Sequence, residues 1–165
     1  MPFRVERRVE FRDTDAAGIV HFSAFFPMME SAEHALLRSL GIPIMPPAVA
    51  GGATSETVAE GETAGSGPSG SGPSGSHEIV TWPRVSASCE YRSAARFEDC
   101  LTFEVMVTRV GSSSVRYGHR ISCGQRLVAE GSMTAVCCRL LPGGGLEKLA
   151  IPGWIRQRLT STPQD

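Results

Sequence analysis

The chain has 165 residues, 41% of them hydrophobic, and its 16 Lys and Arg against 17 Asp and Glu leave a formal net charge of −1. This length fits one domain, and the near-neutral charge argues against nucleic acid as a partner, because nucleic-acid-binding domains usually carry a basic excess. No apolar run approaches the roughly 20 residues of a membrane-spanning helix, and the first residues lack the apolar core of a secretory signal.

The cysteine pattern indicates a reducing environment. The chain has five cysteines, with Cys137 and Cys138 adjacent and no Cys-x-x-Cys pair. A chain of this length needs no disulfides to hold its core, and the spacings of zinc and thioredoxin-type sites are missing. We therefore predict buried, reduced thiols in a cytoplasmic protein, and no metal site.

The N-terminal part has the pattern of a strand, a loop and a helix. Apolar and charged residues alternate over Phe3–Phe11, which predicts a strand, and a loop is expected over Arg12–Gly18. The next segment, Ser23–Leu40, is predicted to be a helix with Ser23 as its N-cap and Gly41 as its terminator. Apolar residues three or four apart form the face to be buried, namely Phe25, Met29, Ala32, Leu36 and Leu40.

A segment rich in glycine, serine and proline follows this helix. Every residue from Gly65 to Ser76 is Gly, Ser or Pro. The segment has no apolar side chains to bury, so nothing offsets the entropy of ordering it. We predict a flexible surface excursion over residues 46–77 inside a single domain, because neither flanking piece is long enough to bury a core alone.

The remainder of the chain has the pattern of successive strands. Alternating residues predict four strands and a short terminal helix, and Pro83 marks an edge or a bulge in the first strand. A strand, one long helix and then four strands indicate an α+β fold with an antiparallel sheet, not a doubly wound nucleotide-binding fold. The expected bounds are Ile79–Tyr91, Leu101–Thr108, Val115–Cys123 and Leu127–Leu140 for the strands, and Ile151–Leu159 for the helix.

The loop before the long helix holds the strongest candidate for chemistry. Asp13 and Asp15 lie two residues apart, close upstream of the expected helix start. A helix N-terminus presents N–H groups that can stabilise an oxyanion, and a carboxylate beside it could attack a carbonyl or deprotonate water. The spacing alone also fits a helix cap, which is the commoner role of such residues. An EF-hand calcium loop is excluded, because Gly18 comes too early and no Glu follows at the required spacing.

The residues around this pair resemble a known family. The string DTDAAGIV at residues 13–20, with the helical segment after it, is similar to the opening of hot-dog-fold acyl-CoA thioesterases of the 4-hydroxybenzoyl-CoA thioesterase type. The segment Tyr91–Leu101 also resembles that family's turn into its central strands. The resemblance covers nearly the whole chain apart from the excursion, and it implies an antiparallel sheet wrapped around one long central helix.

The resemblance implies catalytic roles for individual residues. Asp15 would attack the thioester carbonyl or act as a general base, and the backbone N–H of Phe22 would donate to the oxyanion. Gly18 would allow the tight turn into the helix, and Asp13 would shape the loop. His21 is a further candidate, and its alternatives are a place at the acyl pocket and a structural role. A related branch of bacterial thioesterases carries a histidine one place later, where this chain has Phe22.

Binding roles follow from the same resemblance. Val20 and Phe25 are candidates to line the acyl pocket, with ordinary core packing as the alternative. Arg109 and Arg116 are the nearest candidates to contact the CoA phosphates, and further candidates are Arg92, Arg96 and Lys148. The alternative for each is a solvated surface charge. The other polar candidates are expected at a solvated or subunit-facing surface (Glu30 and Glu33) or in structural positions (His34 and His119).

The activity implied by the resemblance is hydrolysis of an acyl-CoA thioester to CoA and a carboxylic acid. It would need no metal or cofactor, and the expected assembly is a homodimer or homotetramer. The alternative is a non-catalytic module that binds acyl-CoA, since fold does not fix function, and such a module would not need Asp15. A hot-dog dehydratase is a third possibility, but its expected histidine–acid pattern on the helix is not evident.

Overall fold

The computed structural model describes residues 2–44 and 80–161, so the excursion predicted over residues 46–77 lies outside the described residues. Two short 3₁₀ helices, Phe11–Asp13 and Phe22–Ala24, accompany the strands and α-helices. No helix in these two ranges is long and apolar enough to cross a membrane. The larger elements are β1 (Phe3–Arg8), α1 (Phe25–Ser39), β2 (Arg84–Tyr91), β3 (Cys100–Val110), β4 (Ser114–Cys123), β5 (Arg126–Val136), β6 (Cys138–Leu140), β7 (Leu146–Lys148) and α2 (Gly153–Thr160).

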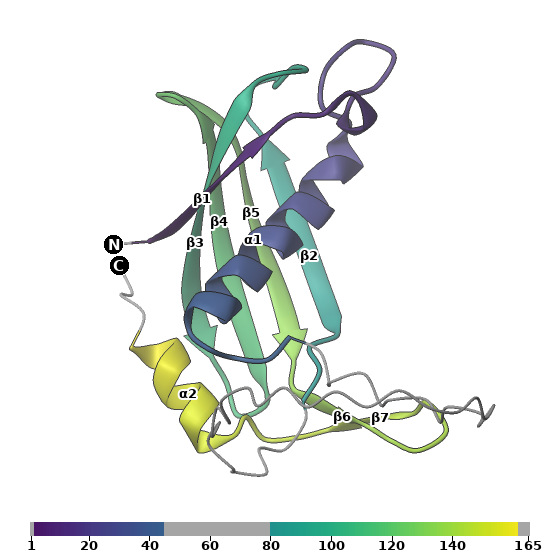
Figure 1. Ribbon diagram of the computed structural model, residues 1–165, viewed down its shortest axis with the longest axis vertical. Coiled ribbons are helices and arrows are strands. Elements are labelled where there is room, and N and C mark those ends of the chain that lie inside the picture. Colours follow the sequence, from purple (N-terminus) through teal and green to yellow (C-terminus); the bar gives the residue numbers. More distant parts are fainter. Residues whose placement is uncertain (1, 45–79, 162–165) are drawn as a thin grey trace, which may run out of the picture.

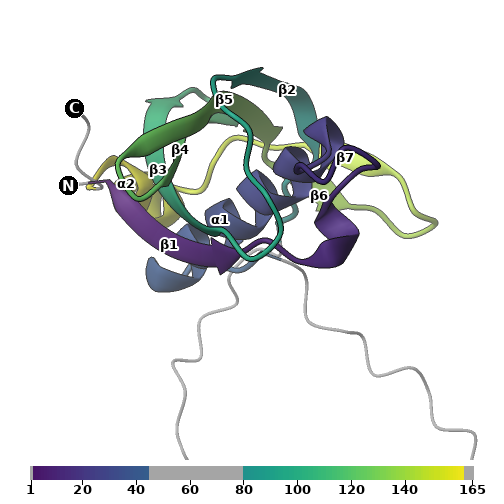
Figure 2. The ribbon, with the colours of Figure 1, turned by 90° about the horizontal axis from the view of Figure 1, so that it is seen from above.

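The strands β1 to β5 form one antiparallel sheet in the order β1-β3-β4-β5-β2. The sheet curves around α1, which lies against its inner face (Figures 1 and 2). This is the hot-dog architecture, an α+β fold, and it confirms the predicted element order. The strands β1 and β2, which flank α1 in the sequence, are the two edges of the sheet.

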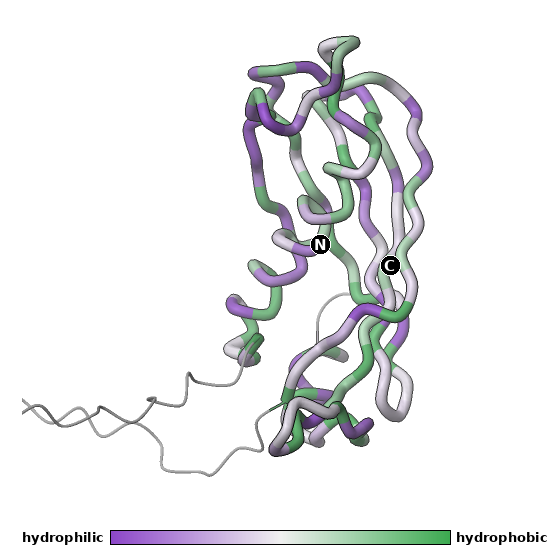
Figure 3. Tube along the Cα trace, turned by 90° about the vertical axis from the view of Figure 1, so that its right-hand side faces the viewer, coloured by the Kyte–Doolittle hydropathy of each residue, from purple (hydrophilic) through white to green (hydrophobic). Residues whose placement is uncertain are grey.

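The core lies between α1 and the inner face of the sheet. Green and purple residues follow one another along the helix and the strands in Figure 3, which is the alternation expected of elements with one buried face. Burying one large apolar side chain fully contributes roughly 1.5–3 kcal/mol to the stability of the fold. In β3 every second residue from Leu101 to Val107 is buried. The predicted helix stripe is also buried, except for the half-buried Leu40. The buried members are Leu101, Phe103, Val105 and Val107 in β3, and Phe25, Met29, Ala32 and Leu36 in α1.

Gly131 in β5 allows the helix to lie close to the sheet. A Cβ atom at this position would stand 2.6 Å from Met29 Sδ and 2.7 Å from the backbone oxygen of Ser88. Because the second contact is to backbone, a side chain at position 131 would require the helix or β2 to move. The absence of a side chain here therefore sets the spacing between α1, β5 and β2.

Several predicted boundaries are wrong. The first strand ends at Arg8 instead of Phe11, because the carboxylate of Asp13 accepts a hydrogen bond from the Glu10 N–H and turns the chain into a 3₁₀ helix. Phe11, predicted on the buried face, is 79% exposed. The last predicted strand breaks at Cys137, whose N–H donates to Ser113 O at 2.7 Å, and the hairpin of β6 and β7 beyond it was not predicted.

The ends of α1 were predicted in part. Gly41 has a φ of 63° and its N–H donates to Arg38 O, so the predicted terminator is confirmed. Ser23 is not the N-cap, because the helical segment starts one residue earlier and His21 is the cap residue. The terminal helix is confirmed, but it begins two residues later and ends one residue later than predicted, at Gly153–Thr160.

A bulge near the start of β2 turns Arg84 toward the helix. The register with β5 shifts between Arg84 and Ser86, directly after Pro83, so the predicted edge strand with a bulge is confirmed. Tyr91 at the other end of β2 packs against α1. Without the shift, strict alternation would place Arg84 and Tyr91 on opposite faces.

None of the five cysteines forms a disulfide, in line with the predicted reduced thiols, but they are not all buried. Cys137 and Cys138 are buried, Cys89 and Cys123 are half-buried, and Cys100 is exposed at the start of β3. The exposure of Cys100 follows from its outward position in the alternation of that strand.

Candidate active site

A tight loop between β1 and α1 carries Asp15. Thr14 and Val20 pair across the loop, the Asp15 N–H donates to Ile19 O at 2.9 Å, and the Gly18 N–H donates to Asp15 O at 2.9 Å. Gly18 has a φ of 72°, a conformation that other residues adopt only at a cost. The glycine therefore shapes the turn that presents Asp15, and it does not itself line the pocket described below.

The Asp15 carboxylate is held by one backbone hydrogen bond. Its Oδ1 accepts from the Ala17 N–H at 2.8 Å. Within residues 2–44 and 80–161, Oδ2 accepts no hydrogen bond and neither oxygen pairs with a cation. By contrast, the buried Asp13 carboxylate contacts Arg7 Nη2 at 3.2 Å and the Glu10 N–H at 2.9 Å. Asp13 thus has a structural role, and Asp15 keeps an oxygen available for chemistry.

The start of the helical segment provides an unpaired backbone donor. The Ser23 N–H donates to His21 Nδ1 at 3.3 Å, and the Ala24 N–H donates to His21 O at 2.9 Å. The Phe22 N–H, which directly precedes these two donors in the chain, has no partner among the described residues. An unpaired N–H at a helix start is the type of donor that can stabilise a developing oxyanion.

His21 lies beside this donor but outside the pocket. Its Nδ1 is also 2.7 Å from Ser23 Oγ, and its ring lies 4.4 Å from the ring of Phe22. With Nδ1 accepting from the Ser23 N–H, the neutral ring carries its proton on Nε2. The position of His21 therefore matches the structural alternative, as a cap of the helical segment.

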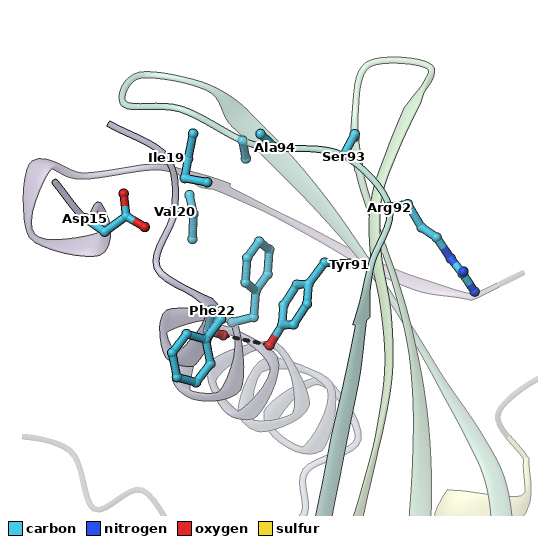
Figure 4. A pocket seen from close by; sticks show the side chains of 10 residues that line it. Asp15, Ile19, Val20, Phe22, Tyr91, Arg92, Ser93 and Ala94 are labelled. Atoms are coloured by element: carbon cyan, nitrogen blue, oxygen red, sulfur yellow. Dashed lines mark hydrogen bonds between the residues drawn. The ribbon is translucent and has the colours of Figure 1, made fainter. Parts of the chain in front are cut away.

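A pocket of about 410 Å³ brings the principal predicted residues together (Figure 4). Asp15 and Phe22 lie at one side, while Val20 and Phe25 contribute apolar surface although both are more than nine-tenths buried. The full lining is Asp15, Ile19, Val20, Phe22, Phe25, Tyr91, Arg92, Ser93, Ala94 and Ala95. The pocket thus combines a free carboxylate oxygen and an unpaired N–H with a mostly apolar wall.

Tyr91 is a pocket residue to which the sequence assigned no role in the site. Its hydroxyl donates to Phe22 O at 2.9 Å, and its ring lies 5.4 Å from the ring of Phe25. Burial raises the pKa of the Tyr91 phenol above its ordinary value, so the hydroxyl stays protonated and remains a donor. The sequence held two signals: Tyr91 is the last residue of an expected strand, where side chains commonly reach a site, and it begins the segment Tyr91–Leu101 that carries part of the family resemblance.

The predicted CoA contacts Arg92 and Arg116 lie apart from each other. Arg92 lines the pocket, but its guanidinium points away from the other residues in Figure 4 and contacts Glu90 at 2.6 Å and Glu130 at 3.4 Å. Arg116 lines a separate depression of about 290 Å³ at the β3–β4 turn, which lies at the opposite end of the sheet from the Asp15 loop (Figure 1).

This second depression carries two unpaired positive charges. Arg109 and Arg116 face each other across β3 and β4, and neither has a carboxylate partner in the described parts of the chain. Arg116 Nε donates to Thr134 Oγ1 at 3.4 Å. Like charges opposite each other on a sheet repel, so the pair has the charge expected of a site for an anion.

Glu33 occupies a different position from the predicted one. The prediction that it lies at a solvated or subunit-facing surface is wrong: Glu33 is fully buried, with Oε1 2.9 Å from His119 Nε2 and Oε2 2.5 Å from Arg84 Nη2. The reason is its place on the helix, one turn after the buried Met29. The predicted structural position of His119 is confirmed by this contact, and Glu30 is partly exposed near Arg84, at 3.8 Å.

The cluster of Glu33, Arg84, His119 and Tyr117 is separate from the Asp15 pocket, since none of these residues lines it. Burial, and next the charge of Glu33, raise the pKa of the Tyr117 phenol far above its usual range. Desolvation lowers the pKa of the nearby His34, so that it is neutral at pH 7. No group of His, Cys, Asp and Glu side chains in residues 2–44 and 80–161 is arranged to hold a metal ion.

Comparison with known proteins gives a family and a fold. A family model described as the thioesterase-like superfamily matches residues 9–159. A curated protein of Aquifex aeolicus (strain VF5), whose name assigns it provisionally to the esterases, is 54% identical over 43 residues. That match covers 26% of this chain and 34% of the relative, so the chain aligns with about a third of that protein's length.

Solved structures match nearly the whole chain at low identity. A 1,4-dihydroxy-2-naphthoyl-CoA thioesterase from Synechocystis superimposes with a TM-score of 0.69 and 20% identity, covering 98% of this chain and 97% of that one. A gentisyl-coenzyme A thioesterase gives a TM-score of 0.67 and 20% identity, covering 95% and 99%. The dynemicin thioesterase gives 0.68 and 15%, covering 97% and 96%. At these identities the likeness establishes the hot-dog fold alone.

Proposed function

The chain belongs to the thioesterase-like superfamily, and we propose from that membership that it hydrolyses acyl-CoA thioesters to CoA and a carboxylic acid, with Asp15 and the Phe22 N–H at the reacting carbonyl. Two of the structurally similar proteins are named as CoA thioesterases. The reaction as proposed needs no metal and no cofactor.

The proposed chemistry uses the two unpaired groups of the pocket. The Asp15 carboxylate either attacks the thioester carbon, forming a mixed anhydride that water then hydrolyses, or removes a proton from an attacking water. In either case the C–S bond breaks and CoA leaves as the thiolate, which takes up a proton. The carbonyl oxygen becomes negatively charged in the transition state, and the Phe22 N–H would stabilise it.

One observation carries this proposal. Asp15, whose carboxylate keeps one oxygen without a partner among the described residues, and Phe22, whose N–H is also without one, line the same pocket, and Ile19, Val20 and Phe25 add apolar wall to it. Acyl transfer requires a base or nucleophile and fixed donors for the developing charge, and an apolar wall suits an acyl group. A non-catalytic module would have no need of the first two groups.

The test is a hydrolysis assay over a panel of benzoyl-, 4-hydroxybenzoyl-, hexanoyl- and palmitoyl-CoA. The loss of the thioester bond should be followed by its ultraviolet absorbance, because the exposed Cys100 would react with thiol-detecting reagents. We expect turnover of at least one of these substrates. Saturable binding in calorimetry without turnover of any of them would instead support the acyl-CoA binding module.

We also propose that the chain forms a homodimer, or a dimer of such dimers, through β2. This strand is an edge of the sheet, and Val85 on it is 62% exposed. An uncovered edge strand with apolar side chains is a template for pairing. Antiparallel pairing with β2 of a second copy would bring the Arg84 end of one strand toward the Tyr91 end of the other.

Introducing a charge on β2 should disrupt this assembly. We expect Val85→Asp to shift the sedimentation coefficient from a dimer or tetramer to the monomer at micromolar concentration, because a charged side chain on an edge opposes strand pairing. Phe97→Asp is the matched control, since Phe97 is also an exposed apolar residue, at 51%, but lies in the turn after β2. A wild-type monomer, or a Val85→Asp variant that still self-associates, would contradict the proposal.

The arginine pair at the β3–β4 turn is proposed to bind the CoA phosphates. Since it lies at the opposite end of the sheet from Asp15, CoA held at one active site would reach the pair of a second copy. We expect Arg116→Ala and Arg109→Ala to raise KM for acyl-CoA about 5- to 30-fold with little change in kcat, because each removes a charge-assisted contact of roughly 1–2 kcal/mol. The N-acetylcysteamine thioester of the same acyl group should be unaffected.

Arg8→Ala provides the control for these variants. Arg8 is exposed and pairs with the exposed Glu98 at 3.0 Å, so its removal changes the net charge equally without touching the pair. Equal effects of all three variants, or equal effects on both thioesters, would show that the arginine pair has no specific role. The proposed location is the cytoplasm, where thiols stay reduced, because none of the five cysteines forms a disulfide.

A further inference from the structure

We infer that Tyr91 is a positioning residue of the active site, whose hydroxyl holds the backbone of Phe22 so that the Phe22 N–H meets the oxyanion. This inference rests on the proposed hydrolysis. It assigns to β2 a part in the reaction, since the hydrogen bond joins the end of that strand to the start of the helical segment. The dashed line in Figure 4 marks this bond, 2.9 Å from the Tyr91 hydroxyl to Phe22 O.

Tyr91 is itself held on two sides. Its backbone belongs to β2, where Tyr91 pairs with Ala129 and Cys89 pairs with Gly131 in regular register. Its ring packs against Phe25 with centroids 5.4 Å apart at an angle of 54°, and Phe25 is buried in the core. The hydroxyl is therefore fixed relative to both the sheet and the helix, as a positioning group must be.

The Tyr91 bond adds an anchor on the carbonyl of Phe22 to the hydrogen bonds that hold the neighbouring peptides. The Phe22 side chain is 61% exposed and contributes little packing. The peptide that precedes Phe22 and carries its N–H is held, since the Ala24 N–H donates to His21 O at 2.9 Å, and the peptide before that one is held by the bond from the His21 N–H to Asp13 O at 2.8 Å. The Tyr91 bond acts on the carbonyl of the peptide that follows, whose N–H, that of Ser23, donates to His21 Nδ1 at 3.3 Å. With the planes on both sides of Phe22 held, rotation about its Cα is restricted, and with it the direction of the Phe22 N–H relative to the pocket.

The expected contribution is to the chemical step. A donor stabilises the oxyanion well only within about 2.7–3.1 Å of it, and complete removal of one such donor costs roughly 10²–10³ in kcat. Loss of the Tyr91 hydroxyl would leave the Phe22 N–H present but less well aimed. In the proposed reaction the hydroxyl contacts no reacting atom, so substrate binding should change little.

The test is the variant Tyr91→Phe, which keeps the ring on Phe25 and removes only the hydroxyl. We expect kcat to fall about 10-fold, a fraction of the effect of deleting the donor, while KM changes less than 2-fold and the pH profile keeps its shape. The amide signal of Phe22 in a ¹⁵N–¹H spectrum should move. The matched control is Tyr117→Phe at the only other tyrosine of the sequence, whose buried hydroxyl has no hydrogen-bond partner among the residues that the structure describes. The kcat of this variant should equal that of the wild type.

The outcomes separate this inference from the proposed function. A wild-type protein without turnover would end both. An active Tyr91→Phe variant with wild-type kcat would overturn the inference and leave the hydrolysis intact. A fall in kcat that only follows the folded fraction measured by circular dichroism, or that Tyr117→Phe reproduces, would also overturn it, because either result would mean that the hydroxyl acts through general stability.

Discussion

Replacing Asp15 by Asn should lower kcat for the best acyl-CoA substrate by about 10²–10⁴-fold, the contribution typical of a positioned base. Asparagine has nearly the same shape, and its side-chain oxygen can still accept the hydrogen bond from the Ala17 N–H that Asp15 Oδ1 accepts now. It cannot attack a carbonyl or remove a proton from water. The fold should therefore persist while hydrolysis is lost, as shown by an unchanged melting temperature alongside the kinetics.

The informative control for this variant is Glu30→Gln. Glu30 is the helix carboxylate that remains partly exposed, with a side chain 43% accessible, so it is the alternative source of a base. We expect its kcat to stay within about 2-fold of the wild type. The reverse pattern, with Asp15→Asn active and Glu30→Gln inactive, would move the chemistry to the helix. If both variants kept wild-type turnover, neither carboxylate would be the base.

Removing the Glu33 carboxylate should cost about 3–5 kcal/mol of the free energy of unfolding, the range for breaking a buried ion pair from one side. Glu33→Ala would leave Arg84 without the carboxylate that lies 2.5 Å from its Nη2, and His119 without the partner of its Nε2. Both side chains would stay buried, at 15% exposure for Arg84 and none for His119. Urea unfolding followed by circular dichroism measures the loss.

Two comparisons make this result specific. Glu30→Ala removes a carboxylate one turn earlier on the helix, which is partly exposed and lies farther from Arg84, at 3.8 Å. Its loss should therefore lower the free energy of unfolding by less than about 1 kcal/mol. Glu33→Gln keeps the side-chain volume and one hydrogen-bond acceptor, so its free energy of unfolding should lie between those of the two alanine variants. If Glu33→Ala unfolded within 1 kcal/mol of the wild type, the cluster would not hold the helix on the sheet in the way its burial indicates.

The elements whose apolar residues recur at one regular spacing were predictable from the sequence. The alternation in Leu101–Thr108 and the helical stripe from Phe25 to Leu36 each fix a buried face, and the order of the elements then leaves few arrangements. The site was predictable where it lies on one continuous stretch, because Asp15 and Phe22 are placed by the same loop and helix start. These local relations need no knowledge of the rest of the fold.

Contacts between distant segments were not predictable in this way. Tyr91 meets Phe22 only because the sheet curves, and Arg84 meets Glu33 only because a bulge reverses one side chain. Glu33 was misplaced because a charged residue was assigned to the surface, although its spacing from Met29 pointed inward. Burial with matched partners can override that polarity rule, and the partners lie on strands far along the chain.

The curvature of the sheet has a consequence for how substrate range could change. The pocket is lined from both edges of the sheet, since the Asp15 loop follows β1 and Tyr91 ends β2. The two sides are joined where the Val20 N–H donates to Ala95 O at 2.8 Å. The width of the pocket is therefore set by how far the sheet closes, which depends on the contact of Met29 with Gly131 in the interior. The acyl groups admitted could thus diverge through core substitutions that leave every residue of the pocket wall unchanged.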